Sequence, residues 1–158
     1  MKILHVITLA ELGGAQSVVI NLAEKSAENG DEVFVASSAH GEMWELLHPK
    51  IKQIKIKNLQ HSLGFKDVLV AKELLALHKK IKPDVVHLHS SKIGILGRLA
   101  FPSAKIIYTI HGFDSIRVQH RKFLFLDKIL QHRFAAIVGV SNYDFENDKL
   151  CELSFNYI

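Results

Sequence analysis

The chain has 158 residues, which is the size of one domain. Hydrophobic residues make up 48% and charged residues 23%, the balance of an ordinary globular protein, and no apolar run reaches the roughly 18 residues that a membrane-spanning helix needs. The formal charge of +4 suits a phosphorylated substrate, an anionic membrane surface or a nucleic acid, and it does not choose among them.

The cysteine content bears on the cellular compartment. Cys151 is the single cysteine, so the chain forms no internal disulfide and no thiolate metal site, which favours a cytoplasmic location. The apolar start at residues 1–7 is too short for a signal peptide, and Glu11 follows it closely. We therefore interpret this start as a first strand.

Short runs rich in β-branched residues alternate with longer runs of helical spacing, which predicts βαβ units. In chain order we expect a strand at 2–8, a helix at 15–28, strands at 32–37 and 51–57, a helix at 66–80, a strand at 84–89, a helix at 93–100, a strand at 105–110, a helix at 118–134, a strand at 135–140 and a helix at 142–152. The predicted fold class is α/β: one domain over 1–158 with a Rossmann-like parallel sheet and helices on both faces.

Local signals refine three of these elements. Isoleucine and lysine alternate along 51–57, which is typical of an edge strand with one face in water. Gly30 is a suitable C-cap for the first helix, and Pro83 stops the helix at 66–80.

The loops that follow the strands are the predicted location of the site. In an open parallel sheet the ligand lies outside the carboxyl ends of the strands, where the strand order reverses. Polar or glycine-rich residues follow four of the predicted strands directly. The candidate substrate-binding residues in these loops are Gly13, Gly14, Gln16, Ser90, Gly112, Asp114, Ser141 and Asn142.

The glycine pair Gly13-Gly14 has two interpretations. Glycine lets a ligand approach the main chain closely, and the helix that starts near Ala15 offers unpaired N–H groups and a positive dipole end to an anion. The alternative is a strand-to-helix turn that requires positive φ. The pair matches neither Gly-x-Gly-x-x-Gly nor a Walker loop, so no dinucleotide or nucleoside triphosphate fingerprint is present.

His111 is the candidate catalytic residue. It ends a predicted strand, and a histidine there can bond a substrate hydroxyl or phosphate and titrate near neutral pH; the alternative is a histidine that bonds a nearby carbonyl. His87 and His89 share a face of one strand, and a zinc site that includes His111 is the minor alternative to packed, hydrogen-bonded side chains. We expect His5 to lie in the core.

The predicted helix at 118–134 is basic and aromatic. The simpler interpretation is a helix that packs on the sheet and keeps a solvated basic face. The sharper one is a helix that lies on an anionic membrane surface. No motif for DNA or RNA binding is present, so we expect no nucleic-acid partner.

Four motifs together resemble the N-terminal domain of family 4 glycosyltransferases. They are LGGAQ at 12–16, PDVVHLHS at 83–90, YTIHG at 108–112 and VSN at 140–142. Each motif alone is weak, but their order and their places at the strand ends are fairly specific, and the resemblance covers nearly the whole chain. It implies one half of a GT-B fold, in which two Rossmann-like domains face each other across a cleft.

The resemblance also implies a chemistry. It is the retaining transfer of a sugar from a nucleotide-sugar donor, as co-substrate, without a metal or other cofactor, in cell-envelope polysaccharide synthesis. The N-terminal domain mainly holds the acceptor, often a lipid-linked glycan. The glycine pair lies near the donor phosphates and the acceptor, and the histidine that matches His111 helps to position the transferred sugar. Peripheral contact with the inner face of the membrane fits the basic helix.

One departure from the family pattern concerns the donor. The family binds its nucleotide chiefly with a C-terminal domain, through a basic pair and a Glu-x7-Glu motif, and nothing after Cys151 supplies these. We therefore expect the chain alone to be inactive and to need that domain or a partner subunit. Two alternatives stay open: a non-catalytic binding or assembly module, which a homodimer would complete, and a stand-alone nucleotide-binding regulator.

Overall fold

The computed structural model describes residues 1–62, 64–111, 129–130 and 132–139. Within them, six parallel strands form one sheet in the order β3-β2-β1-β4-β5-β6. The strands are β1 (Lys2–Ile7), β2 (Glu32–Ser38), β3 (Lys52–Ile56), β4 (Val85–His89), β5 (Ile106–Ile110) and β6 (Ala136–Gly139). All six predicted strands are confirmed to within two residues at each end.

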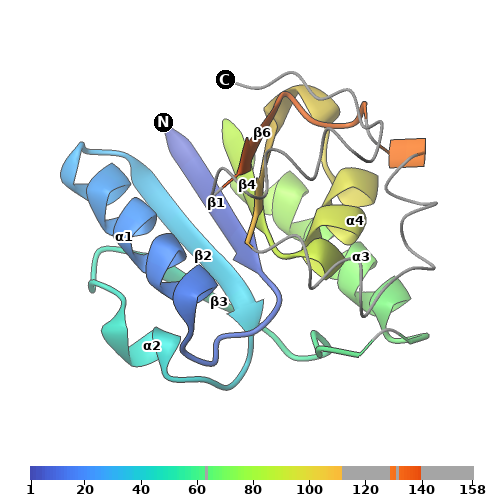
Figure 1. The fold of residues 1–158 in the computed structure, drawn as a ribbon. Coiled ribbons are helices and arrows are strands. Elements are labelled where there is room, and N and C mark those ends of the chain that lie inside the picture. Colours follow the sequence, from blue (N-terminus) through green and yellow to red (C-terminus); the bar gives the residue numbers. More distant parts are fainter. Residues whose placement is uncertain (63, 112–128, 131, 140–158) are drawn as a thin grey trace.

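Helices cover both faces of this sheet. Figure 1 shows α1 (Gly14–Glu28) and the short α2 (Met43–Leu46) on one side, and α3 (Asp67–Ile81) and α4 (Ser91–Ala100) on the other. A single 3₁₀ turn (Ser103–Lys105) precedes β5. The Rossmann-like α/β fold is therefore confirmed.

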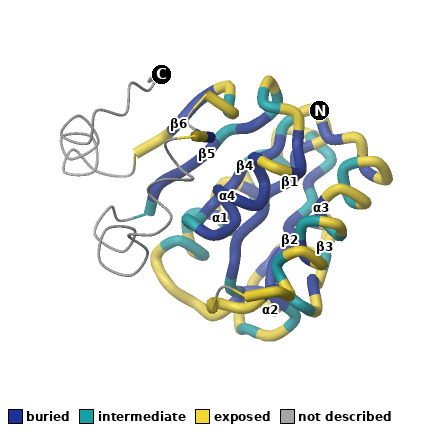
Figure 2. The backbone as a smooth tube through the Cα atoms, turned by 90° about the vertical axis from the view of Figure 1, so that its right-hand side faces the viewer, coloured by how far each residue is buried: buried dark blue, intermediate teal, exposed yellow. Residues whose placement is uncertain are grey.

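The two faces of the sheet build two hydrophobic clusters, because successive side chains of a strand point to opposite faces. Leu4 and Val6 of β1 pack with α3 and α4, whereas Ile7 packs with α1 and α2. Strand β1 is buried from Ile3 onward, as expected for a central strand with helices on both sides, and Figure 2 shows this part of the chain as buried.

The edge strand and the end of the first helix follow the sequence signals. Strand β3 lies at the edge, and three of its five residues are exposed. Gly30 has φ +87, so it adopts the left-handed conformation that ends α1 after the C-cap Asn29.

Helix α2 was not predicted. Its four residues are too few to show a helical period, and they are recognisable only because Met43 and Trp44 are buried against the α1 side of the sheet. Most of the predicted helix at 118–134 and all of the one at 142–152 lie outside the described residues. Of the first helix, Ile129 and Leu130 are helical, but residues 132–134 form a turn and an irregular segment, so its predicted end at 134 is wrong.

The structure adds one observation on membranes. In the part of the chain that it describes, no helix is both long enough and apolar enough to cross a bilayer.

Candidate functional site

The strand order reverses between β1 and β4, which lie side by side in the centre of the sheet. The chain leaves β1 toward α1 on one face and leaves β4 toward α4 on the other (Figure 1). In open parallel sheets this reversal is the position of the ligand crevice at the carboxyl edge. Thr8 and Ser90 are the residues that directly follow these strands. Their hydroxyl oxygens lie 2.5 Å apart, so a hydrogen bond joins the two loops at the point where the predicted site lies.

Ser90 has an unusual backbone conformation, with φ 91 and ψ 148. A residue with a Cβ rarely adopts this region, which costs about 1–3 kcal/mol and persists where the surroundings impose it. Its carbonyl accepts the first hydrogen bond of α4 from the Gly94 N–H at 2.8 Å. The strained turn fixes the direction in which α4 leaves the sheet.

The glycine pair does not need positive φ. Gly13 is extended, with φ −167 and ψ −175, so the interpretation as a turn of positive φ is wrong. A Cβ at Gly14 would meet nothing within 4 Å, and one at Gly13 would meet only the Gln16 side chain at 3.1 Å. Open space before the first turn of α1 leaves room for a ligand to approach the main chain.

The loop that carries this pair is held from two sides. Gln16 donates from Nε2 to the Leu9 carbonyl at 2.8 Å, so the predicted substrate-binding glutamine has a structural contact within the loop. From the β2 side, the Ser38 hydroxyl accepts from the Ala10 N–H at 3.0 Å, and the Ala10 carbonyl accepts from the Met43 N–H at 3.0 Å.

Gly41 allows this close packing of the two loops. Its φ is +140, and a Cβ there would lie 2.1 Å from the Ala10 carbonyl carbon. Only glycine fits both the conformation and the space. The loop after β2 therefore determines where the loop after β1 lies.

Four histidines gather on the α1 face of the sheet: one on β1, two on β4, and His111 directly after β5. His5 of β1 pairs in register with His87 of β4, and His89 pairs with Thr109 of β5, two residues before His111. His5 Nδ1 lies 3.3 Å from His89 Nε2, and His89 Nδ1 lies 3.0 Å from His111 Nε2. The expected proximity of His89 and His111 is confirmed, and His5 is buried as predicted.

Burial keeps the imidazoles of His5, His87 and His89 neutral. It lowers the pKa of His5 to about 4. Burial also lowers the pKa of His87 to about 3, with repulsion from His5 and His111 as smaller causes. The pKa of His89 falls for the same reasons, first burial and then the neighbouring histidines.

Three of the four could in principle hold a metal ion. The ligand nitrogens of His5, His87 and His89 lie within 4.8 Å of one another, and this is the one such group among the described residues. However, His87 Nε2 already bonds the Thr109 hydroxyl at 2.6 Å, and both ring nitrogens of His89 bond other histidines. These hydrogen bonds account for the arrangement of the cluster without a metal ion. The expectation that the protein uses no metal stays a prediction.

A pocket of about 730 Å³ lies along the same carboxyl edge, beside the end of β1. This volume is in the range of small-molecule sites. Residues from the loops after β1, β2 and β3 line it: Leu9, Glu11, Ser38, Ala39, His40, Lys57, Leu59, Gln60 and His61. Lys57 is a cation, His40 and His61 carry imidazole rings, and all three side chains are exposed.

Lys92 holds the third of these loops in place. Its ammonium group is buried and donates to the carbonyls of Gln60 at 2.8 Å and Ser62 at 2.6 Å. It also pairs with the Asp67 carboxylate at 2.6 Å. Because an ammonium has three N–H groups, these three oxygens satisfy it completely.

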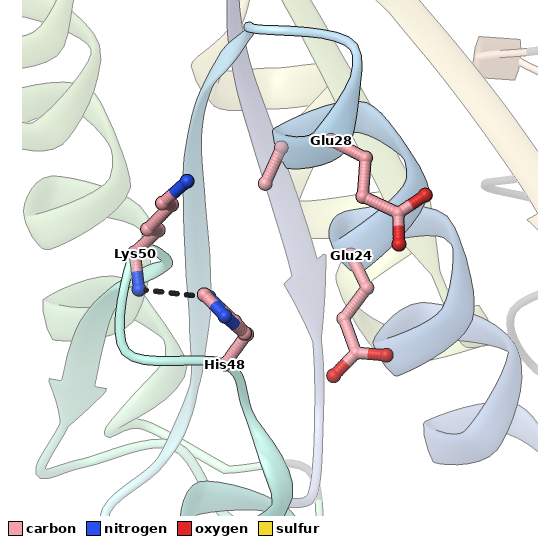
Figure 3. Close-up of a pocket in the computed structure, with 5 residues that line it drawn as sticks. Glu24, Glu28, His48 and Lys50 are labelled. Carbon is pink, nitrogen blue, oxygen red and sulfur yellow. Dashed lines mark hydrogen bonds between the residues drawn. The ribbon is translucent and has the colours of Figure 1, made fainter.

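A second, smaller pocket of about 180 Å³ lies at the opposite edge of the sheet (Figure 3). Glu24 and Glu28 of α1 and His48 and Lys50, which precede β3, line it, with His48 Nδ1 accepting from the Lys50 N–H at 3.2 Å. Ligands of open parallel sheets bind at the carboxyl edge and not at the amino edge. A substitution in this second pocket is therefore a suitable control for one in the pocket at the carboxyl edge.

The predicted site residues divide into two groups. Gly13, Gly14, Gln16, Ser90 and His111 all follow β1, β4 or β5 at the carboxyl edge, as expected. Gly112, Asp114, Ser141 and Asn142 lie outside the described residues. Substrate binding by either group stays a prediction.

Sequence reasoning missed the basic lining of the pocket and Lys92. It treated the lysines of 51–57 as the wet face of an edge strand and did not consider the residues that follow. The signal was present in the run Lys57, Gln60 and His61 directly after a predicted strand, because that position belongs to the ligand edge.

Comparison with known proteins gives one family. The sequence model described as Glycosyltransferase Family 4 matches residues 12–147. A relative from Escherichia coli, named UDP-Gal:alpha-D-GlcNAc-diphosphoundecaprenol alpha-1,3-galactosyltransferase, is 32% identical over 117 residues, which are 72% of this chain and 30% of the relative.

Solved structures share the fold. A glycosyltransferase from Rickettsia africae superposes with a TM-score of 0.74 at 22% identity, over 98% of this chain and 40% of its own. Anabaena HepE, crystallised in complex with UDP and glucose, superposes with a TM-score of 0.72 at 23% identity, over 96% of this chain and 41% of its own. The chain thus spans less than half the length of the proteins that it matches.

Proposed function

Because the chain belongs to glycosyltransferase family 4 and has the fold of one half of a GT-B enzyme, we propose that it forms the acceptor-side domain of a retaining glycosyltransferase. That enzyme transfers a sugar from a nucleotide-sugar donor, without a metal ion, to a lipid-linked acceptor of cell-envelope polysaccharide synthesis. The observation that carries the proposal is the pocket at the carboxyl edge, which is lined in part by Leu9 and Glu11 of the loop that leads to the glycine pair.

The lining of this pocket favours an acceptor with a phosphate group. Lys57 supplies a positive charge, and His40 and His61 each supply a ring that can donate a hydrogen bond, while Leu9 and Leu59 add apolar surface. The acceptor named for the Escherichia coli relative is a sugar joined through a diphosphate to undecaprenol, which has the same combination of charge and apolar chain.

His111 is the residue that we propose for the donor side. It directly follows β5, two strands away from the glycine loop, and it is half-buried. We assign it the role of orienting the transferred sugar through a hydrogen bond. The glycine loop and the N-terminus of α1 are the groups that would face the phosphates of the donor.

Acceptor binding can be measured on the full chain without a donor. The probe is N-acetylglucosamine joined by a diphosphate to a short prenyl alcohol, titrated by calorimetry against the same molecule without the diphosphate. We expect the diphosphate compound to bind, and Lys57→Ala to weaken it by about tenfold, since a hydrogen bond to a charged group contributes about 1.5–3 kcal/mol.

The matched control is Lys50→Ala, which removes a lysine from the pocket at the opposite edge (Figure 3). It should leave the affinity unchanged. Equal binding of the two compounds, or an equal loss in both variants, would contradict an acceptor site at the carboxyl edge.

A further inference from the structure

Three histidines form a hydrogen-bonded chain from the core to the crevice. His5 bonds His89 at 3.3 Å, and His89 bonds His111 at 3.0 Å through its other ring nitrogen. The first two side chains are buried, at 2% and 0% exposure, whereas His111 lies at the carboxyl edge. The chain therefore connects a buried end with an end in the proposed site.

The donor directions within this chain are not independent. A neutral imidazole has one N–H donor and one unprotonated nitrogen that accepts. His89 uses one ring nitrogen toward each neighbour. If it accepts from His5, it must donate to His111, and if it donates to His5, it must accept from His111. Only two arrangements exist, and they differ in which nitrogen of His111 carries the proton.

The buried end decides between the two. His5 Nε2 is fully buried and has no hydrogen-bond partner. If His5 donates through Nδ1, its Nε2 is an unprotonated acceptor without a donor. If His5 accepts through Nδ1, its Nε2 carries the proton and is a buried N–H donor without an acceptor. An orphaned buried N–H is the rarer and costlier of the two, so the chain runs outward from His5.

We infer that His89 is a positioning residue that donates from Nδ1–H to His111 Nε2 and thereby fixes His111 as the tautomer with its proton on Nδ1. His111 then has its N–H donor at one defined ring nitrogen and is not a mixture of tautomers. His87 lies beside the chain, with its ring centroid 3.9 Å from that of His89, and it bonds the Thr109 hydroxyl. It therefore supports the ring of His89 without entering the sequence of donors.

This tautomer has a consequence for the site. A histidine that orients a sugar hydroxyl by donating a hydrogen bond needs its proton on the nitrogen that faces the hydroxyl. In this arrangement the protonated nitrogen is Nδ1, because Nε2 accepts from His89. The link between the tautomer and sugar binding rests on the proposed role of His111. The inference about the tautomer itself does not depend on that role.

The tautomer can be read directly by NMR. In the full chain labelled with ¹⁵N-histidine, long-range ¹H–¹⁵N correlation at pH 7.5 distinguishes protonated from unprotonated ring nitrogens, and His111→Gln assigns the signals. We expect the Nδ1–H form of His111 to exceed the other form by about tenfold. A predominant Nε2–H form, or an even mixture, in the unmodified chain would overturn the inference.

Two substitutions test the role of His89. In His89→Leu nothing donates to His111 Nε2 from that position, so the Nδ1–H form should lose its excess. In His89→Gln the side-chain amide can still donate, and the excess should return. An unchanged tautomer in His89→Leu would show that another group sets it and would overturn the role of His89.

The control for general destabilisation is His78→Leu. It removes another imidazole with a buried, unbonded nitrogen, on α3, away from the chain of histidines. It should leave the His111 signals unchanged. The tautomer is measured without substrate, so this test is independent of the proposed function. A wrong tautomer inference would appear in the NMR signals of the unmodified chain, whereas a wrong proposed function would appear in the acceptor titration.

Discussion

At the scale of single residues, the lysines of this chain differ most in how their charge is compensated. The ammonium of Lys92 is buried and pairs with the half-buried Asp67 carboxylate, with side-chain exposures of 6% and 13%. Lys52 pairs with Glu32 at a similar distance, but these side chains are 58% and 39% exposed. Water compensates the surface pair when one partner is lost, and it cannot reach the buried one.

Lys92→Met should therefore destabilise the fold strongly. It leaves the Asp67 carboxylate buried without a counter-charge and two carbonyls of the pocket loop without a donor, with an expected cost of about 3–5 kcal/mol in the free energy of unfolding. Urea denaturation measures it. Lys52→Met is the matched control, and it should lower the free energy of unfolding by no more than about 1 kcal/mol. Similar losses in both variants would mean that the Lys92 pair is no more than a surface contact.

At the scale of elements, α4 is the most deeply buried of the described helices. Eight of its ten residues are buried, and it carries glycines at 94 and 97. A Cβ at Gly97 would lie 2.5 Å from Leu88 Cδ1, and one at Gly94 would lie 2.7 Å from the Tyr108 ring. The glycines are needed for the close approach of the helix to β4 and β5, which places Ser90 and Lys92 at the edge.

Gly97→Ala tests this packing. Alanine favours a helix by about 1 kcal/mol over glycine, but overpacking a core costs about 1–3 kcal/mol, and Leu88 is fully buried and has no space to move into. We expect a net destabilisation of about 1–2 kcal/mol by thermal or urea unfolding. Gly14→Ala is the control, since nothing lies within 4 Å of its Cβ, and it should not destabilise. A stabilised Gly97→Ala would contradict the close approach of α4.

At the scale of the whole molecule, the buried imidazoles couple stability to pH. Burial lowers the pKa of His5 to about 4 and that of His87 to about 3, from an unfolded value near 6.5. Between these values the unfolded chain binds more protons than the folded one. Stability is therefore complete above about pH 6.5 and is lost as the pH falls toward 4.

We expect the free energy of unfolding to fall by at least about 2 kcal/mol between pH 7 and pH 5. Urea denaturation at several pH values measures the slope. His5→Gln removes one of the groups responsible and should make the slope shallower, and His40→Gln, at an exposed position, controls for the loss of a histidine from the surface. A stability that is constant over this range would mean that the folded and unfolded chains bind equal numbers of protons, so that burial does not lower these pKa values.

Much of the fold followed from local patterns. The order of strands and helices, the edge strand β3 and the cap at Gly30 are each encoded within one element, by hydrophobic period or by a glycine at a helix end. The places of Gly13, Gly14, Ser90 and His111 also followed, because the carboxyl ends of parallel strands meet at one edge. The positions at 112, 114, 141 and 142 stay predictions.

Only the tertiary structure decided which of these residues meet. His5 bonds a residue 84 positions away because β1 lies next to β4, and Lys92 bonds a loop 30 and 32 positions before it. A periodic pattern reports which face of an element is buried, but not which neighbour covers it. The sequence by itself therefore determined the fold class and the edge that holds the site, whereas strand order and loop packing decided the histidine chain, the pocket and the buried ion pair.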